Sequence, residues 1–318
     1  MRPLVLLFPG QGSQKPGMAR DLADAFPAAR ATLAEIDAAL DAPLTPIMYD
    51  GPADALTLTH NAQPALLAHG AAAWAVVRDA ARPHVVAAAG HSLGEFTAHH
   101  AAGTMDAATG ARLVRRRGQL MYEAGVARPG AMAALLGDPD RPIEEICAEA
   151  TAAAGEVVPA NYNSPGQLVI SGEVAGVEKA MELAKAAGVK RAVRLQVSGA
   201  FHSPLMAPAR AGLEAALAAA PLRDPAFPVF ANVSAAPVRT ADETRRLLAE
   251  QLGAPVRWTA LVQALAAAHP DALYVEMGPG TVLAGLVKKI APGVETLPCG
   301  TAPEVEALLA RLAAPSAA

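Results

Sequence analysis

The segment VVAAAGHSLGEF, residues 85–96, decides how the chain is expected to fold. Residues 85–90 are small and apolar, which is typical of a buried strand, and a helical pattern begins at Leu93. A serine flanked by Gly90 and Gly94 lies between them. This strand, tight turn and helix predict one unit of an α/β protein with a parallel sheet.

The same alternation of strand and helix patterns extends toward both ends of the chain. Short apolar runs alternate with long alanine-rich segments of helical periodicity, a pattern that predicts a parallel sheet covered by helices. Buried strands are expected over residues 4–8, 227–234 and 272–278, and helices over 19–40, 62–79 and 93–102. We therefore expect one large α/β domain.

After residue 128 the predicted strands and helices follow one another in a different order. Strand, helix, hairpin, helix and strand patterns follow one another over residues 131–198. The order β-α-β-β-α-β is that of the ferredoxin-like arrangement. The sequence thus predicts a small ferredoxin-like domain over 129–198, inserted between the two parts of the large domain, 1–128 and 199–318.

The composition excludes several classes of protein. With 318 residues, 53% hydrophobic and 18% charged, the chain can bury a large core and is not expected to be disordered. Its net charge is −4 and it has no long basic block, so no nucleic acid is expected as a partner. No apolar stretch is long enough to cross a membrane, and the N-terminal apolar run is too short for a signal peptide.

The two cysteines, Cys147 and Cys299, lie far apart in sequence and neither belongs to a CxxC pair. Their spacing therefore gives no reason to expect a metal site. We expect buried thiols in a reducing compartment, the cytoplasm.

The turn Gly90-His91-Ser92-Leu93-Gly94 matches the G-x-S-x-G pattern in the strand–turn–helix context that a nucleophile elbow requires. Flanking glycines permit a strained turn that exposes the serine hydroxyl and leaves the next backbone N–H free to bind an oxyanion. Ser92 is therefore a candidate nucleophile. The alternative is that the glycines serve packing alone and the serine caps the helix.

A serine hydroxyl needs a base to take its proton, and the chain has eight histidines. His202 differs from the others because it ends the run VSGAFH just beyond a predicted strand and before Pro204, in a loop suited to presenting a catalytic side chain. Context favours His202 and leaves the other seven open.

A second glycine-rich turn, FPGQGSQ (8–14), follows the first predicted strand. The spacing of its glycines does not fit the dinucleotide fingerprint, and no lysine stands where a phosphate-binding loop needs one. The turn can instead offer a backbone N–H near Gln11, the second donor of an oxyanion hole.

The segment LVRRRGQLM (113–121) places Arg117 in the middle of an apolar helical face formed by Leu113, Val114, Leu120 and Met121. A buried guanidinium costs several kcal/mol unless it meets an anion. Beside a serine nucleophile, that anion would be a carboxylate at the far end of an acyl substrate, bound in bidentate fashion. The alternative is an internal Asp or Glu.

The chain as a whole resembles the malonyl-CoA:acyl carrier protein transacylases and the acyltransferase domains of polyketide synthases. The blocks that carry the resemblance are FPGQGSQ (8–14), QPALL (63–67), GHSLGE (90–95), RRRGQLM (115–121), GAMAALLG (130–137), NYNSPGQLVISG (161–172), FHSPLM (201–206), PVRW (255–258) and EMGPGTVL (276–283).

The resemblance implies a role for individual residues. Ser92 and His202 match the catalytic pair of the family, and Arg117 matches its carboxylate-binding arginine. The backbone N–H groups of Gln11 and Leu93 match the oxyanion hole. Gln251 matches the residue whose main-chain carbonyl orients the histidine. Gln63 and Asn163 match further pocket positions. The implied fold is a hydrolase-like α/β domain with a ferredoxin-like insert, which agrees with the fold predicted from the patterns above.

Substrate selectivity in this family is associated with the residues just before the histidine, here Gly199, Ala200 and Phe201. A bulky Phe201 resembles the malonyl-selective pattern and would disfavour an α-methyl branch by roughly 1 to 3 kcal/mol. Gly199 departs from the histidine or tyrosine usual at that position in polyketide domains.

The resemblance implies a cytoplasmic acyltransferase of fatty acid biosynthesis with two substrates, malonyl-CoA and a phosphopantetheinylated acyl carrier protein, and with no metal or redox cofactor. Three alternatives stay open: a free-standing acyltransferase of a polyketide pathway or malonate-handling complex, a serine esterase or thioesterase, and a non-catalytic carrier-docking module. The basic residues Lys15, Arg115, Arg116, Lys288 and Lys289 are candidates for contact with an acidic carrier protein.

Overall fold

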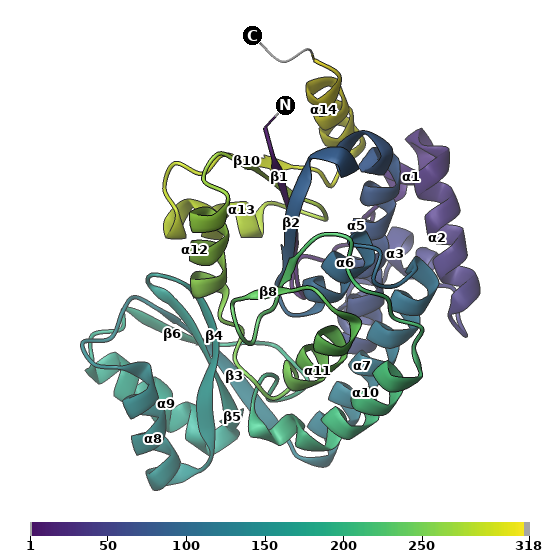
Figure 1. The fold of residues 1–318 in the computed structure, drawn as a ribbon. Helices are drawn as coiled ribbons and strands as arrows, with labels where there is room; N and C mark the ends of the chain where they lie inside the picture. The colour runs from purple at the N-terminus through teal and green to yellow at the C-terminus, as the bar shows by residue number, and fades with distance from the viewer. Residues whose placement is uncertain (1, 315–318) are drawn as a thin grey trace.

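The computed structural model describes residues 2–314, which form two sheets of different kinds (Figure 1). The larger sheet has the strand order β10-β9-β1-β2-β7-β8, and all its pairs are parallel except β7 with β8. Its strands are β1 (Leu4–Phe8), β2 (Val85–Gly90), β7 (Val229–Phe230), β8 (Pro237–Val238), β9 (Leu273–Glu276) and β10 (Thr296–Pro298). The parallel α/β class is confirmed.

Strand β1 lies in the middle of this sheet and is buried on both faces, which explains its unbroken apolar sequence. Leu4, Leu6 and Phe8 belong to one hydrophobic core, and Val5 and Leu7 to another on the opposite face. Side chains of successive strand residues point to opposite faces, so one short strand joins both cores.

Helices cover both faces (Figure 1). The sheet face that carries Leu4, Leu6 and Phe8 packs against α1 (Arg20–Ala25), α2 (Pro27–Ala39), α5 (Thr59–Ala81), α6 (Leu93–Ala101), α7 (Ala107–Ala127), α10 (Ala207–Ala219) and α14 (Ala302–Ala313). The face that carries Val5 and Leu7 packs against α12 (Trp258–Ala268) and α13 (Val282–Ile290). The remaining helices are α3 (Thr45–Asp50), α4 (Ala53–Thr57) and α11 (Ala241–Glu250), together with the 3-10 turns η1 (Arg82–His84) and η2 (Pro204–Met206). None of the helices in residues 2–314 combines the length and apolar character needed to span a bilayer.

The smaller sheet is antiparallel, with the order β4-β5-β3-β6, and has two helices on its outer side (Figure 1). Its elements are β3 (Gly130–Leu136), α8 (Ile143–Ala154), β4 (Val157–Ser164), β5 (Gln167–Glu173), α9 (Val174–Ala186) and β6 (Arg191–Arg194). This is the predicted ferredoxin-like unit. The boundaries at 128/129 and 198/199 stay a prediction.

Strand β4 of the small sheet forms two backbone hydrogen bonds with Val256, in the segment between α11 and α12. The N–H of Tyr162 on β4 donates to the Val256 carbonyl at 2.9 Å, and the N–H of Val256 donates to the Ala160 carbonyl at 2.8 Å. These hydrogen bonds hold β4 against the segment that leads into α12.

Three expected elements differ from the observed ones. The helix over 19–40 is two helices, because Phe26 precedes Pro27 and takes an extended conformation that a helix interior excludes. The strand over 191–198 ends at Arg194; the N–H of Leu195 still donates to the Met132 carbonyl at 2.8 Å, and Leu195, Gln196 and Val197 line a cavity. The strand over 227–234 contains only Val229 and Phe230, because the backbone N–H of Asn232 donates to a side chain outside the sheet.

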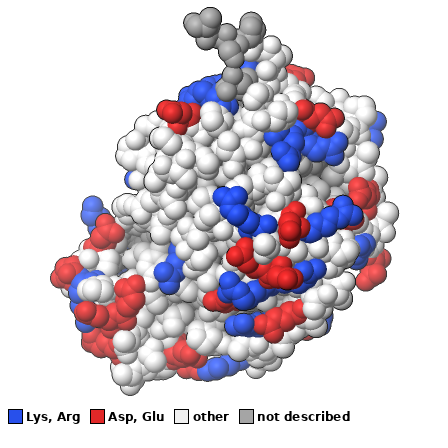
Figure 2. Space-filling model, viewed as in Figure 1, with Lys and Arg blue, Asp and Glu red and all other residues white. Residues whose placement is uncertain are grey.

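On the face shown in Figure 2, basic and acidic side chains lie next to one another, and several exposed pairs of them form ion pairs. Examples are Arg210 with Glu214 at 2.7 Å and Arg246 with Glu250 at 3.2 Å. Pairs of this kind contribute about 0 to 1 kcal/mol each. The fold therefore depends on the buried apolar cores.

Close backbone packing at the start of α6 generates a first prediction. A methyl group on Gly94 would lie 2.0 Å from the Phe8 carbonyl oxygen, so Gly94→Ala must displace β1 or α6. We expect it to lower the free energy of unfolding by more than about 2 kcal/mol in a denaturant titration.

Gly285→Ala in α13 is the matched control, because nothing lies within 4 Å of the added methyl group. It should leave stability unchanged or raise it by up to about 1 kcal/mol. Equal effects of the two substitutions would contradict the packing argument.

Candidate active site

Ser92 stands at a strained turn between β2 and α6. Its backbone has φ 51° and ψ −105°, a conformation that a non-glycine residue rarely adopts. The side chain of Asn232 fixes the turn: its Oδ1 accepts from the Ser92 N–H at 2.7 Å and its Nδ2 donates to the Gly90 carbonyl at 2.7 Å. The predicted elbow geometry is thus present.

His202 lies against Ser92. The Ser92 hydroxyl is 2.7 Å from His202 Nε2, and His202 Nδ1 is 2.9 Å from the Gln251 carbonyl and 3.2 Å from the Ala254 carbonyl. Because both carbonyls only accept, Nδ1 carries the proton and Nε2 accepts from the serine. Of the eight histidines, the one favoured by context is the one in contact with the serine.

The protonation state of His202 suits a base. Burial, followed by the nearby positive charge of Arg117, lowers the pKa of His202 to about 3. The imidazole is therefore neutral at neutral pH, with Nε2 free to take a proton.

The two residues predicted to form the oxyanion hole, Gln11 and Leu93, both line the cavity that contains Ser92. Helix α6 begins at Leu93, so the Leu93 N–H has no acceptor within the helix. Gln11, in the turn after β1, lines the same cavity as Leu93 and Ser92. The Gln11 side chain donates to Thr59 Oγ1 at 3.3 Å, which ties this turn to the start of α5.

Arg117 is 1% exposed, in the apolar face of α7 that the sequence predicted. Its guanidinium donates to Gln63 Oε1 at 2.8 Å, Gln251 Oε1 at 2.9 Å and Ser92 Oγ at 3.1 Å. Its Nε has no partner within the described chain, and no Asp or Glu among residues 2–314 forms an ion pair with it. The alternative of a direct internal ion pair is therefore not supported.

The charge of Arg117 persists despite its burial. Burial lowers the pKa of Arg117 to about 10, and the Glu95 carboxylate opposes this shift. At neutral pH the side chain is a cation beside the Ser92 hydroxyl.

A cavity of about 350 Å³ contains these groups. Ser92, His202 and Arg117 lie in its wall together with Gln11, Leu93 and Asn163, and the apolar residues that line it are Met121, Met132, Val169, Leu195, Val197 and Phe201. The apolar lining comes largely from the small sheet and the segment after β6, so the cavity lies between the two parts of the molecule.

The remaining predicted residues fall around this cavity. Phe201 lines it, whereas Gly199 does not and packs instead against α7, where a methyl group would lie 3.1 Å from Gly125 Cα. Asn163 lies 2.8 Å from His91 Nε2, and Gln63 lies behind Arg117, with its Nε2 donating to Met121 Sδ at 3.2 Å.

Two buried polar residues of the site were not predicted as site residues, Asn232 and Glu95. Glu95 Oε2 accepts from the Asn232 N–H at 3.0 Å and from Gln251 Nε2 at 2.7 Å. Burial raises the pKa of Glu95 to about 7, against the lowering effect of these hydrogen bonds and of Arg117. The only sequence signal was the place of Glu95 in the block GHSLGE.

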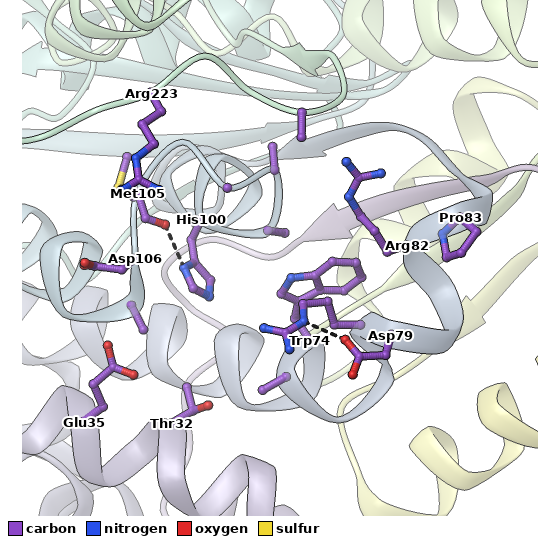
Figure 3. A pocket seen from close by; sticks show the side chains of 17 residues that line it. Thr32, Glu35, Trp74, Asp79, Arg82, Pro83, His100, Met105, Asp106 and Arg223 are labelled. Carbon is purple, nitrogen blue, oxygen red and sulfur yellow. Dashed lines mark hydrogen bonds and ion pairs between the residues drawn. The ribbon is translucent and has the colours of Figure 1, made fainter.

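A larger cavity, about 650 Å³, lies away from this site, among α2, α5, α6 and the start of α7 (Figure 3). Its three arginines, Arg78, Arg82 and Arg223, share the wall with Glu35, Asp79 and Asp106. His100 Nδ1 is already within 3.1 Å of the Met105 carbonyl. Because its charges are mixed and it lacks the serine–histidine pair, we place the active site in the smaller cavity.

The described residues offer no cluster of three or more His, Cys, Asp or Glu side chains suited to a metal ion. The residues that line the cavity offer a serine hydroxyl in contact with a neutral imidazole and a guanidinium beside them, an arrangement suited to acyl transfer.

Comparison with known proteins agrees with this chemistry. Residues 5–299 match the acyl transferase domain family. The malonyl CoA-acyl carrier protein transacylase of Escherichia coli (strain K12) is 43% identical over 313 residues, 98% of this chain and 99% of that protein. The acyl-carrier-protein-S-malonyltransferase from Bartonella henselae superimposes with a TM-score of 0.93 at 42% identity, covering 98% of this chain and 100% of that one.

A malonyl-transacylase solved in complex with a type II PKS acyl-carrier protein is also similar, with a TM-score of 0.91, 39% identity and coverage of 97% and 99%. The resemblance seen in the sequence is thus confirmed over nearly the whole chain. The chain belongs to the acyl transferase domain family and is an acyltransferase.

Proposed function

We propose that this enzyme transfers a malonyl group from malonyl-CoA to the phosphopantetheine thiol of an acyl carrier protein, through a seryl ester on Ser92. One observation carries the choice of acyl group: a buried guanidinium 3.1 Å from the nucleophile, with no ion-pair partner in the described chain. A carboxylate at the end of the acyl group supplies the missing anion. The names of the relatives support the same substrate and acceptor.

In the first half-reaction, His202 Nε2 takes the proton of Ser92 Oγ as the oxygen attacks the thioester carbonyl. The N–H groups of Gln11 and Leu93 stabilise the resulting oxyanion. The carbon–sulfur bond then breaks and the coenzyme A thiolate leaves with the proton from His202. This leaves a malonyl ester on Ser92.

In the second half-reaction, the carrier thiol gives its proton to His202 Nε2 and its sulfur attacks the ester. The bond to Ser92 Oγ breaks, and the serine oxygen recovers the proton from His202. One base thus serves both half-reactions, and because the malonyl ester forms and coenzyme A leaves before the carrier thiol reacts, the mechanism is ping-pong. Neither a metal nor a redox cofactor takes part in these steps.

Phe201 is proposed to disfavour branched acyl groups. Its ring lies in the cavity wall beside His202, where an α-methyl group would add volume to a bound malonyl group. The expected discrimination against methylmalonyl is roughly 1 to 3 kcal/mol. We assign no selectivity to Gly199, whose position against α7 lies outside the cavity lining.

The carrier protein is proposed to dock on exposed basic residues. Arg115 donates to the His60 carbonyl at 2.6 Å and Arg116 lies 3.8 Å from Glu123, so both have partners within the chain. Lys15, Lys288 and Lys289 form no ion pair with any described residue and are the stronger candidates.

We place the enzyme in the cytoplasm and in fatty acid biosynthesis. The buried free thiols of Cys147 and Cys299 suit a reducing compartment. A polyketide pathway is the second candidate, favoured by the similarity to a transacylase solved with a type II PKS carrier protein. Measuring transfer to carrier proteins of both pathways distinguishes them.

Mass spectrometry of the intact protein tests the seryl ester. After brief mixing with malonyl-CoA and no acceptor, the wild type should gain one malonyl group, which an added carrier protein removes. Ser92→Ala should gain none. Steady release of coenzyme A and free malonate without an adduct would instead identify a hydrolase, and carrier binding without turnover would identify a docking module.

Replacing Arg117 tests the choice of acyl group. We expect Arg117→Ala to lower kcat/KM for malonyl transfer by about 100-fold or more, because the substrate carboxylate loses its charged partner, and to retain part of the acetyl transfer. Arg115→Ala, on the same helix, is the matched control and should leave the ratio of the two activities unchanged. An equal loss of malonyl and acetyl transfer in Arg117→Ala would indicate a structural arginine.

The lowered pKa of His202 predicts the pH dependence of loading. A folded-state pKa of about 3 keeps the base neutral across pH 5 to 8, so the rate of Ser92 malonylation should not fall as pH decreases through 6.5. Rapid-quench measurement of the adduct tests this. A rate that declines about tenfold per pH unit below 6.5 would contradict it, since that is the behaviour of an imidazole with an ordinary pKa.

A further inference from the structure

The side-chain amide of Gln251 lies between Glu95 and Arg117. Its Nε2 donates to Glu95 Oε2 at 2.7 Å and to the Ser92 carbonyl at 3.0 Å, while its Oε1 accepts from Arg117 at 2.9 Å. The Gln251 side chain is fully buried, so water cannot substitute for any of these partners. The amide is satisfied at both ends by protein groups.

The chemistry of the partners allows only one orientation of this amide. A carbonyl oxygen accepts hydrogen bonds, a guanidinium only donates them, and an ionised carboxylate only accepts them. The NH₂ end of Gln251 must therefore face Glu95 and Ser92, and the oxygen must face Arg117. Removing Glu95 would leave the NH₂ end with one anchor in place of two.

Protonation of Glu95 does not abolish this arrangement. Oε2 of Glu95 already accepts from two N–H groups, whereas Oε1 has no partner among the described residues, so Oε1 is the oxygen that can take a proton without displacing a donor. Oε2 remains an acceptor in both states. The acceptor oxygen, more than the charge, is the feature that holds Gln251.

Arg117 has five N–H donors, of which three have acceptors in Gln63, Gln251 and Ser92, and none is used by a carboxylate of the described chain. A carboxylate in direct contact would form a bidentate pair with the guanidinium and occupy the N–H groups that a substrate carboxylate needs. With Gln251 in between, Glu95 opposes the burial-driven shift in the pKa of Arg117 without touching it. Arg117 is thereby oriented while its Nε stays unpartnered.

We propose that Glu95 is a positioning residue for acyl selection, which acts through the Gln251 amide to hold the Arg117 guanidinium in the geometry that binds the acyl carboxylate. This inference rests on the proposed function, because it concerns the malonyl carboxylate.

The contact of Glu95 with Asn232 does not make Glu95 essential to the elbow. The Asn232 side chain keeps its own bonds to the Ser92 N–H and the Gly90 carbonyl. The His202 imidazole is held by the main-chain carbonyls of Gln251 and Ala254. Loss of Glu95 should therefore affect a substrate that uses Arg117 far more than one that does not.

The test compares initial rates of Ser92 acylation by malonyl-CoA and by acetyl-CoA, followed by intact-protein mass spectrometry without acceptor. The enzymes are the full-length wild type, Glu95→Met and Glu95→Gln. Methionine keeps the length of the side chain and removes the acceptor, whereas glutamine retains an acceptor oxygen. Thermal unfolding of each variant is recorded alongside.

We expect Glu95→Met to lower the malonyl-to-acetyl rate ratio about tenfold, the effect of losing one hydrogen bond to a charged site. Glu95→Gln should rescue the ratio to within about threefold of the wild type, because its oxygen can occupy the place of Oε2. A ratio unchanged in Glu95→Met, or a ratio equally lowered in both variants, would overturn the proposal.

Two further outcomes, a variant that does not fold and a wild type that takes up no malonyl group, can be distinguished from these. If Glu95→Met does not fold, Glu95→Asp replaces it, because the shorter side chain withdraws the acceptor from Gln251; an unchanged ratio in that variant would equally overturn the proposal. If the wild type takes up no malonyl group, the proposed function itself fails. If the wild type takes up malonyl and the variants keep its malonyl-to-acetyl ratio, only the proposal for Glu95 fails.

Discussion

The buried charge of Arg117 is the constraint on which the arrangement of the site depends. Placing a guanidinium in an apolar face costs several kcal/mol unless polar groups surround it, and here those groups come from three separate parts of the chain. Gln63 comes from α5, Gln251 from the end of α11, and Ser92 from the elbow. Because each is an uncharged acceptor, the cation is tolerated without being neutralised, and it remains able to attract a substrate anion.

The fold brings these groups together at the carboxyl ends of two adjacent parallel strands. Strand β1 ends at Phe8, just before Gln11, and β2 ends at Gly90, just before Ser92. In an open α/β sheet this edge is where ligands bind, because the loops that leave it converge there. The elbow requires the close approach of α6 to β1 that only glycine at position 94 permits, so packing of the sheet and exposure of the hydroxyl have one common cause.

Sequence reasoning was most successful where the signal is local. The elbow around Ser92, the apolar face around Arg117 and the order of elements in the inserted unit can be recognised from spacing within a few residues. Glu95 and Asn232 could not be recognised as members of the site in this way, because their hydrogen bond joins residues 137 positions apart. The strand expected over 227–234 was too long for the same reason: a tertiary hydrogen bond to Glu95 takes the backbone out of the sheet.

The backbone hydrogen bonds of Val256 connect two parts of the molecule that contribute differently to the site. Ser92, His202, Gln251 and Arg117 are held by hydrogen bonds within the large part of the molecule, whereas Met132 and Val169 in the cavity wall belong to the small sheet. Substitutions in β3 or β5 can therefore reshape the space offered to an acyl chain while the reacting atoms keep their distances. The width of the acyl-binding space and the proton-transfer geometry are thus set by different parts of the chain, so that the one can be altered by substitution without altering the other.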